Sequence, residues 1–361
     1  MGREEEGGNF IGCFLYTIAP GSMCLYETGM PLRTKDFDYH LPEDRIAAHP
    51  LAERADSRML VVHRDTGRIE HLMFRDFPGF MQPDDLLVLN DTKVIPARVM
   101  SDDGRTELLC LRRLSPVEWR CLVHPGKRMR AGHTVIVGGI TGTVVEVFEN
   151  GDRLVRWEAP MDLHQHGHLA LPHYMGRGDE PADRERYQTV FAREEGAIAA
   201  PTAGLHFTPE MLEHLPHDFL TLHVGVGTFR PVNVEVVTDH IMHAEEYSVS
   251  AETARRVNAA GRVLAVGTTV TRVLEAIGRE PGHDGQRIPD HAQSGWTDIF
   301  IHPPYPFRVV GGLLTNFHLP QSTLIMLVCA FAGRDLIMEA YRQAVEQRYR
   351  FYSYGDCMLV L

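Results

Sequence analysis

The sequence predicts an α/β fold, with a mainly parallel or mixed sheet, flanking helices and an inserted small β-barrel domain. Two patterns support this prediction. From about residue 195 onward, strands, loops and helices alternate, which is typical of a largely parallel sheet covered by helices. Between Asp84 and Glu158, short β-rich runs recur roughly every ten residues, which is typical of a small barrel or sandwich. A chain of 361 residues is also long enough for two domains.

The expected domain boundaries follow these patterns. Residues 31–83 and 159–361 should form the α/β domain, and residues 84–158 should form the inserted barrel. Residues 1–30 should be an N-terminal extension or an overcalled start, because glutamates stand where a secretory signal would carry basic residues. No later apolar run reaches the length of a membrane span, so we expect a cytoplasmic protein.

The expected strands of the inserted domain are short and are separated by turn residues. Asn150-Gly151 is the strongest hairpin signal, because this pair readily adopts the positive φ angles of a two-residue turn. The runs assigned to strands are Leu86–Leu89, Val94–Val99, Glu107–Arg112, Trp119–Val123, Thr134–Val137, Gly142–Val147 and Leu154–Trp157.

The α/β domain shows repeated strand–loop–helix units. Thr208 followed by Pro209 predicts a helix start, since threonine caps a helix and proline fits its first position. Strands are expected at Leu220–Val226, Arg262–Val266 and Gly311–Leu314, and helices at Val270–Ile277, from Ser322 or Thr323 to Gly333, and at Asp335–Tyr349. In such folds, ligands bind at the carboxyl ends of the strands.

The loop from Pro201 to Phe207 is the most informative one at this edge of the predicted sheet. Gly204 would let the backbone approach a ligand closely, and the helix start at Thr208 offers unpaired N–H groups. His206 could donate or accept a proton near neutral pH. The alternative interpretation is an ordinary turn that contains a hydrogen-bonded histidine.

Two further loops carry glycines after predicted strands. His223–Phe229 lacks the G-x-G-x-x-G spacing and is not followed by a helix, which excludes a dinucleotide phosphate loop. Gly267–Thr269 has the strand–turn–helix context of a loop that binds a carboxylate or a hydroxyl group, but its threonines could equally cap the helix. Neither loop indicates a function by itself.

Charge, cysteine content and histidine spacing exclude several classes of function. The net charge of −12 argues against indiscriminate polyanion binding, so any RNA contact needs local basic patches. The six cysteines form no C-x-x-C pair and are expected to be reduced thiols. Asp162, His164, His166 and His168 alternate as metal ligands can, but such a polar loop is more often solvated, and no metal is expected.

An ordered series of motifs resembles one enzyme family from Asp36 to the C-terminus. The matching segments are Asp36–Tyr39, Leu41-Pro42, His49–Leu51, Asp85–Thr92, Ile95–Arg98, Tyr187–Ala192, Ala200–Phe207, Thr221–Gly225, Thr297–Ile301, Thr315–Pro320, Tyr349–Phe351 and Ser353–Asp356. In these segments the chain is similar to the S-adenosylmethionine:tRNA ribosyltransferase-isomerases of queuosine biosynthesis. It departs from the family pattern at Lys93, His173, Ala244, Val270 and Pro304.

The resemblance implies a transferase and isomerase that modifies tRNA. Members of the family transfer the ribosyl moiety of S-adenosylmethionine to 7-aminomethyl-7-deazaguanine at the wobble position of tRNA. The product is epoxyqueuosine-tRNA, and adenine and methionine are released. S-adenosylmethionine is then a consumed co-substrate, and no cofactor, membrane or obligate protein partner is implied. The sulfonium acidifies the adjacent ribose carbon, so a general base can start the reaction.

The resemblance also implies roles for individual residues. His206 and His223 are the expected proton-transfer groups, and Asp91 is expected to hold the aminomethyl ammonium or to orient a base. The expected substrate-binding residues are Pro201, Thr202, Ala203, Gly204, Leu205, Phe207, Gly225, Gly227, Thr228, Gly267, Thr268, Thr269, Arg272, Thr315, Asn316 and His318. The expected RNA-binding residues are Arg98, Lys127, Arg128, Arg130, Arg348 and Arg350, each of which could instead be a solvated surface charge.

Two alternatives belong to other functional classes. A non-catalytic RNA-binding protein would bind tRNA without releasing adenine. A metal-dependent hydrolase centred on His164, His166 and His168 would contain a bound ion and would lose activity with a chelator.

Overall fold

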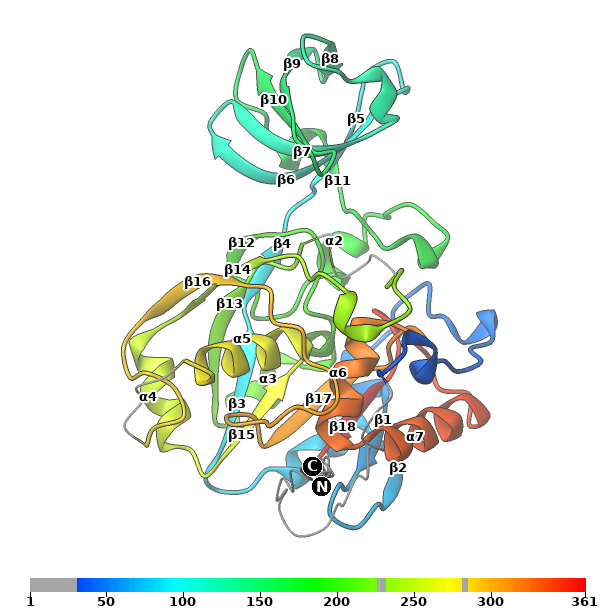
Figure 1. Ribbon diagram of the computed structural model, residues 1–361, viewed down its shortest axis with the longest axis vertical. Coiled ribbons are helices and arrows are strands. Elements are labelled where there is room, and N and C mark those ends of the chain that lie inside the picture. Colours follow the sequence, from blue (N-terminus) through cyan, green and yellow to red (C-terminus); the bar gives the residue numbers. More distant parts are fainter. Residues whose placement is uncertain (1–30, 226, 228–231, 281–284) are drawn as a thin grey trace, which may run out of the picture.

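The structure is a computed structural model that describes residues 31–361 except 226, 228–231 and 281–284. The expected N-terminal extension and the candidate residue Thr228 therefore lie outside the described residues. Figure 1 shows two parts, a large lobe built on one sheet and a smaller lobe that is joined to it by two connecting segments. Nowhere in the described part of the chain is a helix both long and apolar enough to cross a membrane.

The large lobe contains a nine-stranded mixed sheet in the order β16-β14-β13-β3-β15-β17-β18-β1-β2. Its central strands β13, β3, β15 and β17 run parallel to one another, and antiparallel pairs lie towards both edges. The strands are β1 (Arg58–Val62), β2 (Ile69–Met73), β3 (Asp85–Asn90), β13 (His217–Leu222), β14 (Glu245–Val249), β15 (Arg262–Val266), β16 (Gln293–Thr297), β17 (Gly312–Asn316) and β18 (Cys357–Val360). The predicted α/β class with a mixed sheet is confirmed.

The position of β3 corrects the boundary that we predicted at Asp84. Residues 84–158 were assigned to the inserted domain, but β3 pairs with β13 and β15 near the centre of the large sheet. All six residues of β3 are buried, because both faces of a central strand are covered. An apolar run of this length fits a strand in either domain, so the sequence alone could not assign it.

The smaller lobe is a seven-stranded antiparallel sheet in the order β11-β5-β6-β7-β10-β9-β8. Its strands are β5 (Arg98–Met100), β6 (Glu107–Ser115), β7 (Glu118–His124), β8 (Thr134–Val137), β9 (Ile140–Val147), β10 (Arg153–Trp157) and β11 (Gly167–His168). It extends from Arg98 to His168 and has its own core, which includes Trp119, Val155 and Trp157. Two short strands, β4 (Thr92–Val94) and β12 (Glu194–Ala197), pair where the two lobes meet.

The helices are mostly short, and the four that the sequence predicts begin within two residues of their predicted starts. Thr208 accepts a hydrogen bond from the backbone N–H of Met211, and Ser322 accepts one from Ile325, so both predicted caps are confirmed. The α-helices are α1 (Leu163–His166), α2 (Asp183–Arg186), α3 (Pro209–Glu213), α4 (Ala251–Ala259), α5 (Thr268–Gly278), α6 (Thr323–Ala332) and α7 (Arg334–Glu346), of which α1, α2 and α4 were not predicted. The 3₁₀-helices include η1 (Thr34–Phe37), η2 (Glu43–Arg45), η3 (Arg54–Asp56), η4 (Phe74–Phe80), η5 (Gly126–Arg128), η6 (His173–Met175), η7 (Thr202–His206) and η9 (Val237–Asp239).

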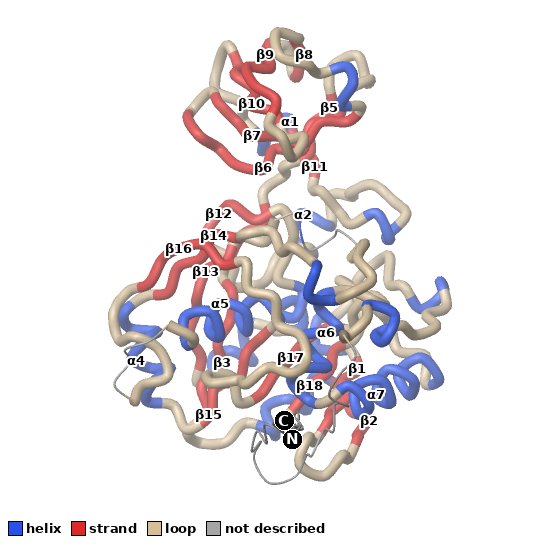
Figure 2. Tube along the Cα trace, in the orientation of Figure 1, coloured by secondary structure: helices blue, strands red, loops and turns tan. Residues whose placement is uncertain are grey.

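Both faces of the large sheet are buried, so its edges and strand ends are left for binding. Leu60 of β1 and Val88 of β3 belong to one hydrophobic cluster, and Met59 and Leu87, which precede them, belong to the other. Helices and short turns cover the sheet, as Figure 2 shows. The loops at the carboxyl ends of β3, β13, β15 and β17 are consequently the elements that can shape a site.

Candidate functional site

Three predicted loops meet around one cavity of about 170 Å³. Two of them follow β15 and β17 of the large sheet, where the strand ends were expected to bring them together, whereas the first follows β12, which pairs only with β4 outside that sheet. The predicted residues that line the cavity are Pro201, Thr202, Ala203, Gly267, Thr268, Thr269, Thr315, Asn316 and His318.

The backbone of Gly267 positions the threonines of the second loop. Gly267 has a φ of 93°, which glycine adopts without strain, and α5 begins at the next residue. Gly267 is the N-cap and provides no side chain, so Thr268 and Thr269 do not cap the helix. Both threonines instead line the cavity at the N-terminus of α5.

Tyrosines that the sequence analysis did not select form much of the remaining wall. Tyr174, Tyr187, Tyr352 and Ser353 line the cavity. The rings of Tyr174 and Tyr352 are 4.5 Å apart between centroids, and the Tyr174 hydroxyl lies 2.6 Å from the Ser353 hydroxyl. Among the described residues that line this cavity, none is Asp, Glu, Lys or Arg. Tyr352 lies between two segments that carry the family resemblance, Tyr349–Phe351 and Ser353–Asp356, and this position is the sequence feature that could have pointed to it.

His206 lies behind the cavity wall and uses both ring nitrogens. Its Nδ1 lies 2.6 Å from the Ser57 hydroxyl, and its Nε2 lies 3.2 Å from Oδ1 of Asn316. The Asn316 amide N–H donates to the carbonyl of Tyr352, so Oδ1 accepts and Nε2 carries the proton. Burial lowers the pKa of His206 to about 4, so the ring is neutral at pH 7.

His318 is a cavity-lining histidine that is also neutral. Its Nε2 lies 2.8 Å from the Thr315 hydroxyl, and its backbone N–H donates to the hydroxyl of Tyr341. Burial lowers the pKa of His318 to about 3. These contacts fix the ring beside Thr315 at the carboxyl end of β17.

His223 lies on a second and larger space. Together with Gly225 and Gly227, it lines a cleft of about 1080 Å³ that extends to residues of the smaller lobe such as Arg112. Its Nδ1 lies 2.8 Å from the Thr92 hydroxyl, and its Nε2 has no hydrogen-bond partner among the described residues. Burial lowers the pKa of His223 and thus favours the neutral ring, in which one nitrogen keeps a lone pair that can accept a proton. Val224 lines both the cleft and the smaller cavity, so the two spaces adjoin.

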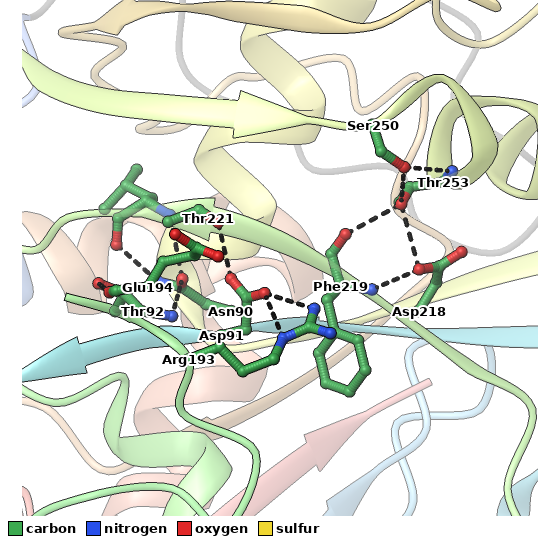
Figure 3. Close-up of polar contacts among 11 residues, drawn as sticks. Asn90, Asp91, Thr92, Arg193, Glu194, Asp218, Phe219, Thr221, Ser250 and Thr253 are labelled. Atoms are coloured by element: carbon green, nitrogen blue, oxygen red, sulfur yellow. Dashed lines mark hydrogen bonds and ion pairs between the residues drawn. The ribbon is translucent and has the colours of Figure 1, made fainter.

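Asp91 is buried in an ion pair at the carboxyl end of β3. Its Oδ2 accepts from Nη2 of Arg193 at 2.6 Å and from Nε at 3.1 Å, and its Oδ1 accepts from the Thr221 hydroxyl at 2.7 Å (Figure 3). The carboxylate is only 5% exposed, whereas the Arg193 side chain is 59% exposed. Asp91 is therefore occupied by protein partners, and it would have to exchange Arg193 for a substrate cation.

Arg272 does not line either space. It is buried, its Nη1 pairs with Glu245 and its Nε donates to the carbonyl of Ile299. Glu245 also accepts the backbone N–H of Gly225 at 3.1 Å. The pair thus fixes the chain after β13 against β14. Glu245, which the sequence analysis did not select, belongs to the cleft wall.

The other candidates of the first loop have packing roles. Leu205 and Phe207 are buried in the two hydrophobic clusters of the large lobe. A Cβ at Gly204 would lie 2.9 Å from the side chains of Phe191 and Thr189, so the glycine permits close packing rather than ligand contact. Val270, one of the departures from the family pattern, is fully buried in the apolar core.

The candidate RNA-binding residues do not form one patch. Lys127, Arg128 and Arg130 are exposed on the smaller lobe, and Arg98 of the same lobe lies 3.1 Å from Glu107. Arg348 and Arg350 follow α7 in the large lobe, where Arg348 is exposed and Arg350 is partly buried.

The histidines once considered as metal ligands have separate partners. His164 lies 3.4 Å from Glu195, and His168 lies 3.1 Å from Asp179. In the described ranges, no group of three or more His, Cys, Asp or Glu side chains is arranged to hold a metal ion.

Comparisons with known proteins agree on one family. The family model described as "Queuosine biosynthesis protein" matches residues 34–360. A protein of Solibacter usitatus named S-adenosylmethionine:tRNA ribosyltransferase-isomerase is 47% identical, over 91% of this chain and 100% of its own length. A protein of the same name from Symbiobacterium thermophilum is 49% identical over the same shares. The crystal structure of an S-adenosylmethionine tRNA ribosyltransferase from Thermotoga maritima is 38% identical, covers 90% of this chain and 100% of its own, and has a TM-score of 0.52.

Proposed function

This chain belongs to the queuosine biosynthesis protein family, and on that premise we propose that it is an S-adenosylmethionine:tRNA ribosyltransferase-isomerase. It transfers and isomerises the ribosyl moiety of S-adenosylmethionine onto 7-aminomethyl-7-deazaguanine at the tRNA wobble position. The products are epoxyqueuosine-tRNA, adenine and methionine. S-adenosylmethionine is consumed as a co-substrate without a further cofactor, and the reaction takes place in the cytoplasm.

The observation that carries this proposal is the convergence of three loops and three tyrosines on one cavity without charged walls. A sulfonium cation is attracted by aromatic rings, and Tyr174 and Tyr352 bring two rings to the wall of this cavity. The N-terminus of α5 lies at the same cavity, and its free N–H groups favour a carboxylate such as that of the methionyl part. The adjoining cleft has the volume to admit nucleotides of the RNA.

The histidines take different parts in the proposed mechanism. His223 has a free Nε2 in the cleft and is the better placed to accept the proton from the ribose carbon beside the sulfonium. His206 acts as a positioning residue, because its Nε2–H orients Asn316 at the cavity. Asp91 exchanges Arg193 for the aminomethyl ammonium, or it holds the segment that carries His223 through Thr221.

The smaller lobe serves as a β-barrel domain that contacts the RNA. A backbone hydrogen bond of 2.8 Å between Asp102, which follows β5, and Ile136 of β8 links the two sides of the curled sheet and supports closure. Lys127, Arg128 and Arg130 project from this lobe and would contact phosphates. Affinity for tRNA should therefore fall steeply with salt.

The decisive experiment is adenine release from S-adenosylmethionine. Purified protein is incubated with tRNA that carries 7-aminomethyl-7-deazaguanine, and unmodified tRNA is the control. Release that requires the modified tRNA, together with a mass gain on the RNA, is the expected result. tRNA binding without release would favour the non-catalytic RNA-binding alternative, and inhibition by a chelator would favour the hydrolase alternative.

A further inference from the structure

Two arginines from distant parts of the chain line a small surface depression beside the candidate cavity, and a third, Arg350, lies next to it. Arg54 of η3 and Arg186 of α2 line the depression, whose wall includes Pro50 and His206. Arg350, which follows α7, donates to the carbonyl of His49, the residue before Pro50. The chain thus brings three guanidinium groups to one place.

None of these three arginines forms an ion pair with a carboxylate among the described residues, although Glu53 also lines the depression and the more distant charges of Glu185 and Asp356 act on Arg54 and Arg350. Arg54 donates to the carbonyls of Leu205 and Glu185, each at 3.1 Å. Arg186 donates to the carbonyls of Ala52 at 2.7 Å and Leu51 at 2.8 Å. Nε of Arg186 and Nη1 of Arg350 are buried and make no hydrogen bond.

Two other partly buried arginines, Arg177 and Arg262, are paired with carboxylates, whereas Arg64 donates only to backbone carbonyls. Arg177 pairs with Asp183 at 2.6 Å, and Arg262 pairs with Asp85 at 2.5 Å. Burial and the neighbouring cation Arg186 both lower the pKa of Arg54, and burial also lowers the pKa of Arg350. Partly buried like charges with unused donors are unfavourable unless an anion joins them.

The depression adjoins the cavity of the proposed function. Ser353 lines both spaces, and the chain of contacts Ser57–His206–Asn316 runs from the depression to the cavity wall. An anion on the arginines would therefore lie beside a base or co-substrate bound in the cavity. Guanidinium groups suit phosphate oxygens because they offer paired donors in one plane.

We infer that Arg54, Arg186 and Arg350 bind backbone phosphates of the RNA strand that brings its wobble base to the site formed by the cavity and the adjoining cleft. This inference rests on the proposed function. A carboxylate of S-adenosylmethionine is the other anion in the reaction, but the N-terminus of α5 already offers it donors inside the cavity. The depression lies outside the cavity and shares only Ser353 with its lining, so an anion bound there is separate from the carboxylate of the co-substrate.

The same arginines also hold residues 49–52 in place, so loss of affinity alone would not separate binding from structure. The salt dependence of affinity does separate them, because each neutralised phosphate contributes about 0.7 to 0.9 to the slope of log K against log salt. A merely structural arginine leaves that slope unchanged.

The test measures the affinity of the full-length protein for modified tRNA between low and moderate KCl concentrations. The variants are Arg350→Gln and Arg54→Gln, each paired with its lysine variant, which keeps the charge. Arg342→Gln is the matched control, because Arg342 is exposed on α7 and pairs with Glu339 and Glu346. Thermal unfolding of every variant reports whether it is folded, and the other glutamine variant supplies the comparison where one is not folded.

The glutamine variants should bind roughly tenfold more weakly at low salt, with a slope smaller by about one, whereas the lysine and Arg342→Gln slopes match the wild type. Weaker binding with an unchanged slope would assign these arginines to loop structure and overturn the inference. A raised KM for S-adenosylmethionine with an unchanged slope would assign them to the co-substrate and overturn it as well. Adenine release by the wild-type protein is measured first, so that failure of the proposed function is recognised separately.

Discussion

Acidification should destabilise this protein through His206, and the size of the effect follows from its burial. The pKa of His206 is lowered to about 4 by burial, whereas a solvated histidine in the unfolded chain titrates near about 6.5. Between these values, the unfolded chain binds a proton that the folded protein does not. Stability is therefore fully present above about pH 6.5 and is lost as the pH falls, by about 1.4 kcal/mol per unit and about 3 kcal/mol in all.

The substitution His206→Gln isolates this contribution. It should lower the free energy of unfolding at pH 7 by about 1–3 kcal/mol, because Ser57 and Asn316 lose a well-placed partner. It should also reduce the number of protons taken up on unfolding between pH 6.5 and 4.5 by about one. The remaining pH dependence of the free energy of unfolding then comes from His318 and the carboxyl groups. Urea unfolding at a series of pH values measures both quantities.

The control is His214→Gln, which removes an exposed histidine that follows α3. Its ring meets water in both the folded and unfolded states, so the pH dependence should stay that of the wild type. If the stability difference between His206→Gln and the wild type is constant from pH 7.5 to 4.5, the reasoning is refuted. The ring would then be protonated or hydrated in the folded protein.

Two further substitutions test contacts at the cleft. Glu245→Gln leaves the buried guanidinium of Arg272 without its counter-charge, so the free energy of unfolding, measured in urea, should fall by about 3–5 kcal/mol. A loss below about 1 kcal/mol would contradict the pairing. Gly196→Ala places a Cβ 2.8 Å from the ring of His223, and the displaced imidazole should reduce the rate of adenine release at least about tenfold. Gly178→Ala, which meets no atom within 4 Å, is the matched control, and equal rates for both variants would show that the position of His223 is unimportant.

The sequence predicted the elements that depend on local chemistry. The caps at Thr208 and Ser322 lie where expected, because their side chains bond to backbone N–H groups three residues away. The final helix ends at Glu346 rather than at Tyr349, since Arg348 adopts a φ of 59° that no continuing helix permits. The convergence of the loops after β15 and β17 was predictable, because parallel strands place their carboxyl ends at one edge.

The chemical assignments of single residues were less predictable. His206 was chosen as a proton-transfer group, yet its two nitrogens are held by Ser57 and Asn316, which are 149 and 110 residues away along the chain. Asp91 was chosen as a ligand for a cation, and its cation in the structure is Arg193. Partners at such separations leave no periodic trace in the sequence, so the availability of a side chain cannot be read from its neighbours.

By itself, the sequence determined that this protein is an α/β protein of one enzyme family, where four of its helices begin, and that the loops after β15 and β17 lie together. Those properties depend on residue types, local hydrogen bonds and strand direction. Only the tertiary structure decided that β3 belongs to the large sheet, that Tyr174 and Tyr352 form a wall of the cavity, and that Arg54 and Arg186 line one depression next to Arg350. Each of these depends on burial and on contacts between distant segments, which are fixed only when the whole chain packs.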